Sequence, residues 1–183
     1  MSENSLTTLH GLVWTALLAA SIGAGAYLIV PIGPAPISMQ PFFVFLAGFI
    51  LGPRGGALAV CLYLLAGTVG LPVFAGGKSG LGHLFGPTGG YLFGFILSAF
   101  LCGLAHKGRS VIPWVKGLAF GGIALIAVYL IGAAWLKFSL DISVAKAWAL
   151  GVVPFIPWDG VKLVAALACC RYLSRFQLLP GQR

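Results

Sequence analysis

The feature that most constrains this chain is a set of long apolar runs without a single charged residue. Four such runs cover residues 11–32, 57–75, 91–105 and 118–136. Their lengths approach the roughly 20 residues that an α-helix needs to cross a bilayer. Only 8% of the 183 residues are charged and 60% are hydrophobic, whereas soluble domains carry about 25% charged residues. A soluble fold would expose apolar side chains over much of its surface, so most of the chain is predicted to lie in membrane lipid.

The apolar runs predict an all-α fold, a polytopic bundle of six transmembrane helices that forms one domain over residues 1–183. The expected spans are residues 11–30, 40–52, 56–74, 89–106, 117–136 and 156–174. Glycine and proline at Gly52-Pro53 should end the second span, the shortest, and long connections are expected at 76–90 and 137–155. The first span is expected to stay uncleaved, because residues 1–10 lack the basic residues of a signal peptide.

The distribution of Lys and Arg predicts that both termini are cytoplasmic, because basic residues are retained on that side of the membrane. The side that includes both termini holds seven: Arg54, Lys107, Arg109, Lys116, Arg171, Arg175 and Arg183. The outer side holds three: Lys78, Lys137 and Lys146.

Several classes of function are excluded by the same patterns. The net charge of +8 comes from basic residues scattered among the connections, so no nucleic-acid partner is expected. No metal site is expected, because His10, His83 and His106 lie far apart and no Cys-x-x-Cys pair occurs. Nucleophile and zinc-protease motifs are absent from the sequence, so no catalytic residue and no cofactor is expected. Active uptake would then need an ion gradient or a separate motor protein.

Two charged residues fall inside an expected span. Asp159 and Lys162 are three residues apart near the start of the sixth span, so they share one helical face. Ionisable residues are costly to insert into a membrane and are candidates for function. The structural alternative is that they neutralise each other, or that Asp159 caps the helix opened by Pro157, where a carboxylate favours the positive end of the helix dipole. That alternative is compatible with ligand binding.

The expected orientation brings polar residues together at the outer side. Gln40, Tyr91 and Asp159 begin the second, fourth and sixth spans, and Lys78 lies in the outer connection between the third and fourth. With Lys162, these residues can meet in an outward-facing pocket between apolar helices. A few polar anchors in an apolar lining suit a small amphipathic ligand.

Small residues recur along the first span. Ala16, Ala20 and Ala24 are spaced by four, with Ala19 and Gly23 beside them. Such stripes let helices approach closely in lipid. They indicate either ordinary packing inside the bundle or a docking face for another membrane protein.

Three separated motifs occur in order along the chain. They are Gly52-Pro53-Arg54 through Gly70-Leu71-Pro72-Val73-Phe74, then Gly86-Pro87-Thr88-Gly89-Gly90-Tyr91, then Pro154-Phe155-Ile156-Pro157-Trp158-Asp159-Gly160-Val161-Lys162. Over roughly residues 11–175 the chain resembles the BioY family, the biotin-binding S components of energy-coupling factor (ECF) transporters. The resemblance implies a six-helix subunit, surrounded by lipid in a prokaryotic cell membrane, that captures biotin outside. It also implies partners, a transmembrane coupling protein of the EcfT type and two cytoplasmic ATPases, and the alanine stripe matches the family's docking motif.

Carried over to this chain, the resemblance makes Asp159 the acceptor for the ureido N–H groups of biotin and Lys162 its polar partner. The connection that contains Lys78 would act as a lid over the ligand. The chain departs from one pattern of the family, in which Asn stands at position 78 and an Arg stands where this chain has Leu92. Lys78 is therefore the candidate partner of the valeryl carboxylate. Gln40 resembles the family's residue at the start of the second helix.

Two other functions remain open on the sequence. The same architecture could serve another vitamin or small carboxylate, because the polarity of the pocket constrains its ligand only loosely. A membrane enzyme could use Asp159 and Lys162 as acid and base, although no nucleophile or metal set accompanies them.

Overall fold

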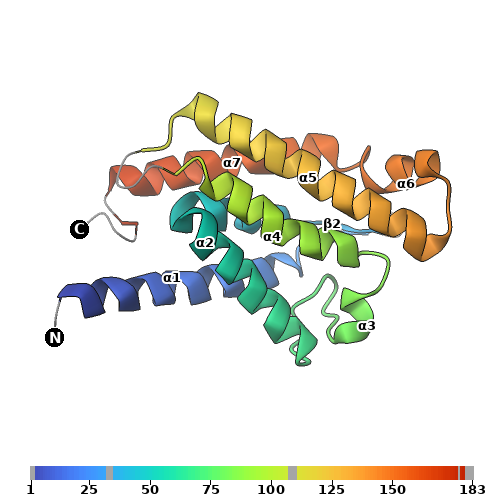
Figure 1. Cartoon of the computed structure of the whole chain (residues 1–183), viewed down its shortest axis with the longest axis horizontal. Coiled ribbons are helices and arrows are strands. Elements are labelled where there is room, and N and C mark those ends of the chain that lie inside the picture. The colour runs from blue at the N-terminus through green and yellow to red at the C-terminus, as the bar shows by residue number, and fades with distance from the viewer. Residues whose placement is uncertain (1–2, 32–34, 107–110, 177, 180–183) are drawn as a thin grey trace.

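The computed structural model describes residues 3–31, 35–106, 111–176 and 178–179, with side chains from residue 9 onward. Most of the described chain is helical, and most of its long helices run roughly along the longest axis of the molecule (Figure 1). The elements are α1 (Glu3–Gly25), β1 (Ile29–Val30), β2 (Ile37–Ser38), α2 (Gln40–Thr68), α3 (Leu81–Leu84), α4 (Gly89–Gly103), α5 (Trp114–Leu140), α6 (Val144–Gly151) and α7 (Ile156–Arg175). The predicted helical bundle is confirmed.

Helix packing follows a simple plan. Helix α2 contacts α1, α4 and α7, while α5 contacts α4, α6 and α7. The start of α1 and the end of α7 lie at the same end of the bundle (Figure 1). Helices α4 and α7 begin towards the opposite end (Figure 1), and residues at the starts of α2, α4 and α7 line the site described below.

Helix α2 consists of the two predicted helical segments, which meet at a kink at Gly52 instead of being joined by a connection over residues 52–56. The chain is helical on both sides of Gly52, which alone has non-helical dihedral angles, φ 75° and ψ −176°. Glycine adopts a positive φ without a steric penalty, and Pro53 then begins the second half, where its missing N–H removes no helical hydrogen bond. Helix α4 packs closely here, because a Cβ atom on Gly103 would lie 2.3 Å from the Pro53 nitrogen. The predicted position of the helix break is correct, but the break is the single residue Gly52 rather than a loop.

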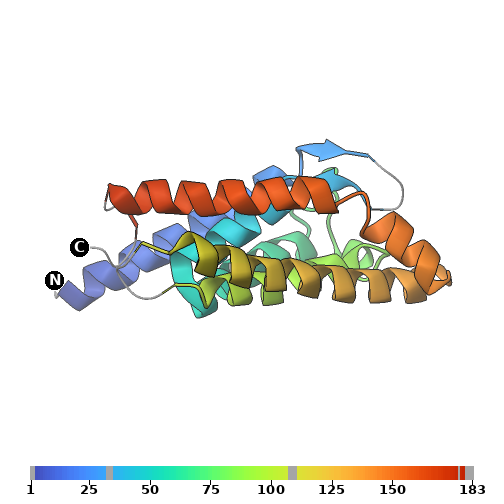
Figure 2. The ribbon, with the colours of Figure 1, turned by 90° about the horizontal axis from the view of Figure 1, so that it is seen from above.

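Two expected spans end earlier than their hydropathy indicated. Helix α1 ends at Gly25 rather than residue 30, and α2 ends at Thr68 rather than residue 74. The apolar residues after α1 instead form an antiparallel hairpin in which Ile29 pairs with Ser38. Figure 2 shows this hairpin near the N-terminal end of α7. Hydropathy indicates which residues avoid water, in lipid or in protein. It does not distinguish apolar residues in a hairpin from apolar residues in a helix.

The two long connections contain helices that were not predicted. Residues 76–90 include the single turn α3, and residues 137–155 include the last residues of α5 and all of α6. Helix α6 begins with a side-chain cap, in which the Ser143 hydroxyl accepts a hydrogen bond from the Lys146 N–H at 3.3 Å. Serine at this position satisfies a backbone donor that the helix leaves free.

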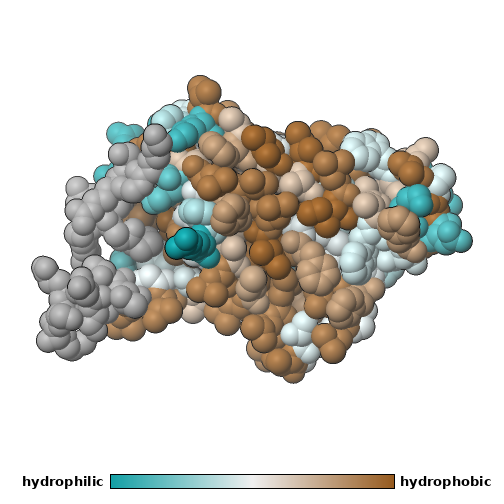
Figure 3. All heavy atoms as spheres, viewed as in Figure 1, coloured by the Kyte–Doolittle hydropathy of each residue, from teal (hydrophilic) through white to brown (hydrophobic). Residues whose placement is uncertain are grey.

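The described surface suits a membrane. Helices α2 and α5 are long and apolar enough to cross one, and α6 with α7, bent by 48°, could form a third span. The described part of α1 from Leu9 and helix α4 are apolar but shorter. Apolar side chains dominate the middle of the face in Figure 3, and polar ones gather towards its ends. Six spans and cytoplasmic termini stay predictions, and Lys107, Arg109 and Arg183, on which the orientation partly depends, lie outside the described residues.

Candidate ligand-binding site

A pocket opens between the hairpin, α3 and the starts of α2, α4 and α7, with the middle of α5 as one wall. It contains about 680 Å³ of space, open solvent at its mouth included. Its walls are mainly apolar and include Leu92, Phe95 and Phe155. Leu92, where one pattern of the family has an Arg, is thus part of an apolar wall.

The most polar part of the pocket is an ion pair on α7. Asp159 and Lys162 are 4% and 7% exposed, and the Lys162 Nζ lies 2.7 Å from the Asp159 Oδ1. The three-residue spacing brings them together on one face of the helix. Phe155, not Asp159, is the N-cap residue of α7, and no side chain caps this helix. The carboxylate is therefore not used as a helix cap, while the expected pairing with Lys162 does form.

Tyr129 completes this end of the pocket, and the sequence reading did not include it. Its hydroxyl donates a hydrogen bond to the Asp159 Oδ2 at 3.1 Å. Each carboxylate oxygen therefore has one protein donor and keeps acceptor capacity for another. A tyrosine inside an apolar run indicates a buried polar contact, because a buried phenol needs a hydrogen-bond partner. Its partner lies 30 residues away in sequence, which no periodic pattern reveals.

Gln40 and Tyr91 also line the pocket. The Gln40 Nε2 donates to the Tyr63 hydroxyl at 2.5 Å, and its Oε1 accepts from the Ser38 hydroxyl at 3.3 Å. Tyr91 presents its ring to the pocket, but its hydroxyl donates to the Gly151 carbonyl at 2.8 Å. Four of the five residues predicted to meet, Gln40, Tyr91, Asp159 and Lys162, line this pocket, with the Tyr91 hydroxyl turned towards α6, whereas the prediction was wrong for Lys78.

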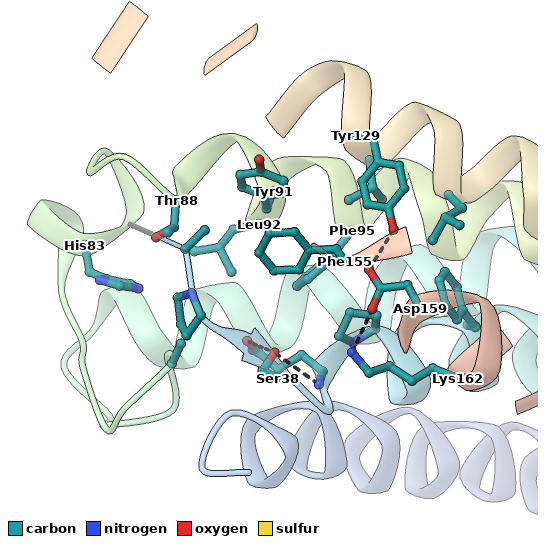
Figure 4. Close-up of a pocket in the computed structure, with 18 residues that line it drawn as sticks. Ser38, His83, Thr88, Tyr91, Leu92, Phe95, Tyr129, Phe155, Asp159 and Lys162 are labelled. Atoms are coloured by element: carbon teal, nitrogen blue, oxygen red, sulfur yellow. Dashed lines mark hydrogen bonds and ion pairs between the residues drawn. The ribbon is translucent and has the colours of Figure 1, made fainter. Parts of the chain in front are cut away.

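Lys78 is exposed and is not among the residues that line the pocket. The lining at this end includes His83 of α3, which is isolated from the other histidines in the sequence and was not predicted to belong to the pocket. Figure 4 shows His83 at one end of the labelled side chains and Tyr129, Asp159 and Lys162 at the other. Burial, and secondly the charge of Lys78, lower the pKa of His83. Lys78 is therefore close enough to His83 to influence it electrostatically.

The alanine stripe of α1 faces away from the bundle. Ala16, Ala20 and Ala24 are exposed, whereas the neighbouring Ala19 and Gly23 are buried. Packing inside the bundle therefore does not account for the exposed stripe. Among the described residues, no group of three or more His, Cys, Asp or Glu side chains could hold a metal ion.

These features define a class of protein: an apolar helical bundle with a small-molecule pocket that has a buried charged pair at one end. Comparison with known proteins makes the class specific. The model of the BioY family matches residues 1–177. The chain belongs to the BioY family.

Its relatives support this assignment over nearly their whole length. The chain is 42% identical to the "Biotin transporter BioY" of Thermotoga maritima, over 91% of this chain and 97% of that protein. It is also 42% identical to the "Probable biotin transporter BioY" of Pyrococcus horikoshii, over 87% and 93% of the two chains. The fold is similar to the crystal structure of the S component for biotin from an ECF-type ABC transporter, with a TM-score of 0.84, 29% identity, and 96% and 95% of the two chains covered.

Proposed function

We propose that this protein is the biotin-binding S component of an ECF-type ABC transporter, which captures biotin from the outside for ATP-driven uptake by partner subunits. The observation that carries the proposal is the Tyr129–Asp159–Lys162 group at one end of a mainly apolar pocket. Relatives that align over nearly the whole chain are named biotin transporters.

The chemistry of this group matches a cyclic urea. A cyclic urea offers two N–H donors, one on each side of its carbonyl, and the carbonyl oxygen as an acceptor. The Asp159 carboxylate can accept from one of these N–H groups, because each of its oxygens keeps acceptor capacity beside its present partner. The Lys162 ammonium has two further donors for the urea carbonyl. Apolar walls at Leu92, Phe95 and Phe155 then suit the hydrocarbon part of the ligand.

Transport requires partners that this chain does not supply. We place the exposed alanine stripe, Ala16, Ala20 and Ala24, against a transmembrane coupling protein of the EcfT type, because small residues permit close helix contact in lipid. Two cytoplasmic ATPases would complete the transporter. This arrangement implies a multi-pass protein of a prokaryotic cell membrane with both termini in the cytoplasm.

The proposed role involves binding and release without chemical change. Asp159 and Lys162 neutralise each other in a direct ion pair, and their position suits recognition of a polar ligand group. Biotin recovered unchanged after prolonged incubation with the protein is the expected result. Conversion of the ligand would favour an enzyme that uses this pair as acid and base.

The test is equilibrium binding of labelled biotin to the purified chain, with unlabelled biotin, thiamine and riboflavin as competitors. Displacement by biotin alone is the expected result. Displacement by thiamine or riboflavin would assign the same architecture to another vitamin. A folded protein that binds none of the three would contradict the proposal.

A further inference from the structure

The end of the bundle that holds the start of α1 and the end of α7, called the terminal end below, has basic side chains without described acidic partners. The chain has three acidic residues in all. Asp159 pairs with Lys162 in the pocket, and Asp141 caps the C-terminal end of α5, whose 27 residues place it about 40 Å from the start of that helix. Glu3 lies outside the described side chains. A counter-charge for the described cations at the terminal end must therefore come from another molecule.

Arg171 is held at the terminal end by two groups from the start of α5. Its guanidinium lies over the Trp114 ring, 5.1 Å from the ring centroid, and its Nη1 donates a hydrogen bond to the Ile112 carbonyl. Figures 1 and 2 show the end of α7 near the start of α5. These contacts fix the plane of the guanidinium. Because this group has five N–H donors, most of them remain for a ligand.

Arg175 adds a second cation on the same face of α7. It is the last residue of the helix, four residues after Arg171, and this spacing makes the two side chains neighbours. Arg175 is exposed and has no hydrogen-bond or ion-pair partner among the described residues. Like charges at this spacing repel each other, and the partial negative charge at the end of the helix dipole compensates only part of two full charges. An anion between the two guanidinium groups would remove the repulsion.

Exposed aromatic side chains surround the two arginines. Tyr172 and Phe176, each the next residue after one of them, are exposed with ring centroids 4.9 Å apart, and the Trp114 ring is exposed beneath Arg171. Trp and Tyr are enriched at the level of the lipid headgroups. The arginines therefore lie at the depth where lipid phosphates lie, and the rings beside them suit lipid more than an aqueous anion.

We propose that Arg171 and Arg175, with the Trp114 ring, form a binding site for the phosphate of an anionic phospholipid in the leaflet at the terminal end. A guanidinium matches two phosphate oxygens with two parallel N–H donors. A zwitterionic lipid carries the same phosphate, but its own cation lies beside the arginines and weakens the attraction. The site lies on α5 and α7, whereas the alanine stripe lies on α1, so a lipid and a partner protein would use different helices.

The experiment is native mass spectrometry of the full-length protein in a neutral detergent, titrated with phosphatidylglycerol or with phosphatidylcholine of the same acyl chains. Wild-type protein should bind phosphatidylglycerol about tenfold more tightly, the value of one charge-assisted hydrogen bond. Arg171→Gln should remove most of this preference. Arg171→Lys should retain only part of it, because lysine keeps the charge but lacks the planar fork. Arg175→Gln, at the exposed end of α7, should also reduce it in part.

Two controls separate this site from general effects. Phosphatidylcholine is the folding control, because a variant that binds it with wild-type affinity has an intact lipid-facing surface. Lys137→Gln is the matched variant. Lys137 lies 4.4 Å from the Phe138 ring centroid in the last turn of α5, so the substitution removes a cation from an aromatic ring at the other end of that helix. It should leave the lipid preference unchanged.

Three outcomes would overturn the proposal. The first is equal affinity of wild-type protein for the two lipids, and the second is an equal loss of preference in Arg171→Gln and Lys137→Gln. The third is displacement of phosphatidylglycerol by inorganic phosphate at the same concentration, which would indicate a site for a soluble anion. None of these measurements uses biotin, so their failure leaves the proposed function intact, and failure of biotin binding leaves this proposal intact.

Discussion

Asp159 and Lys162 are 4% and 7% exposed, whereas Ala16, Ala20 and Ala24 on α1 are exposed. A water-soluble protein would place these residue types the other way round, with charges outside and alanines inside. A lipid environment reverses this distribution in both regions. A charged pair can be kept only where protein surrounds it, and exposed small residues leave room for another helix to approach closely.

The comparison suggests a division of tasks between the two regions. The α7 end of the pocket has polar groups that can recognise a ligand. The exposed stripe of α1 has only small, uncharged alanine side chains. Helix α1 contacts α2, and α2 supplies Gln40 to the pocket, so the regions are connected through one helix. If the tasks are separate, a change in one region should leave the task of the other intact.

The largest expected effect is that of Asp159→Asn on biotin binding. The substitution replaces an acceptor by an amide that carries donors, and it leaves the Lys162 ammonium buried without its counter-charge. A hydrogen bond from the ligand to a charged acceptor contributes about 1.5–3 kcal/mol, so affinity should fall about 10- to 100-fold. Isothermal titration or filter binding of labelled biotin measures this directly.

The matched control is Asp141→Asn, at the exposed C-cap of α5. Asp141 has a positive φ of 49°, which Asn also tolerates. Binding should be unchanged in this variant. Undiminished affinity in Asp159→Asn would remove the carboxylate from the binding role.

The second prediction concerns the other region. Ala20→Leu adds bulk to the exposed face of α1 and should leave biotin affinity unchanged, while uptake by cells that contain the partner subunits should fall about tenfold or more, because close helix packing depends on small residues. Ala134→Leu, an exposed alanine on α5, is the matched control and should permit normal uptake. Normal uptake by Ala20→Leu would show that this face does not dock a partner.

Much of the fold could be predicted because helices that cross a lipid bilayer need long runs of apolar, uncharged residues. Long uncharged runs located the helices, and the i, i+3 spacing placed Lys162 beside Asp159. Hydropathy failed where apolar residues left the helices. It extended α1 into the hairpin at Ile29–Val30 and α2 into the turn before Phe74, and it missed α6, whose helix depends on a serine cap at Ser143.

The candidate site was predicted in part for a related reason. Residues at the starts of helices could be placed on one side of the membrane from the order of the spans. Tyr129 lies in the middle of α5, and it reaches Asp159 only through the packing of two helices distant in sequence. His83 depends on its stacking against Phe74. Contacts of this kind follow from tertiary packing, which a single sequence does not display.

The third prediction sharpens the account of the α7 end by comparing two tyrosines. Tyr129→Phe removes the hydrogen bond to the Asp159 Oδ2 and should weaken biotin binding by about 3- to 10-fold, the value of one hydrogen bond. Tyr91→Phe removes a hydrogen bond to the Gly151 carbonyl, outside the polar end of the pocket, and should change affinity by less than about 3-fold. Equal effects of the two substitutions on measured affinity would show that Tyr129 has no special role in positioning the carboxylate.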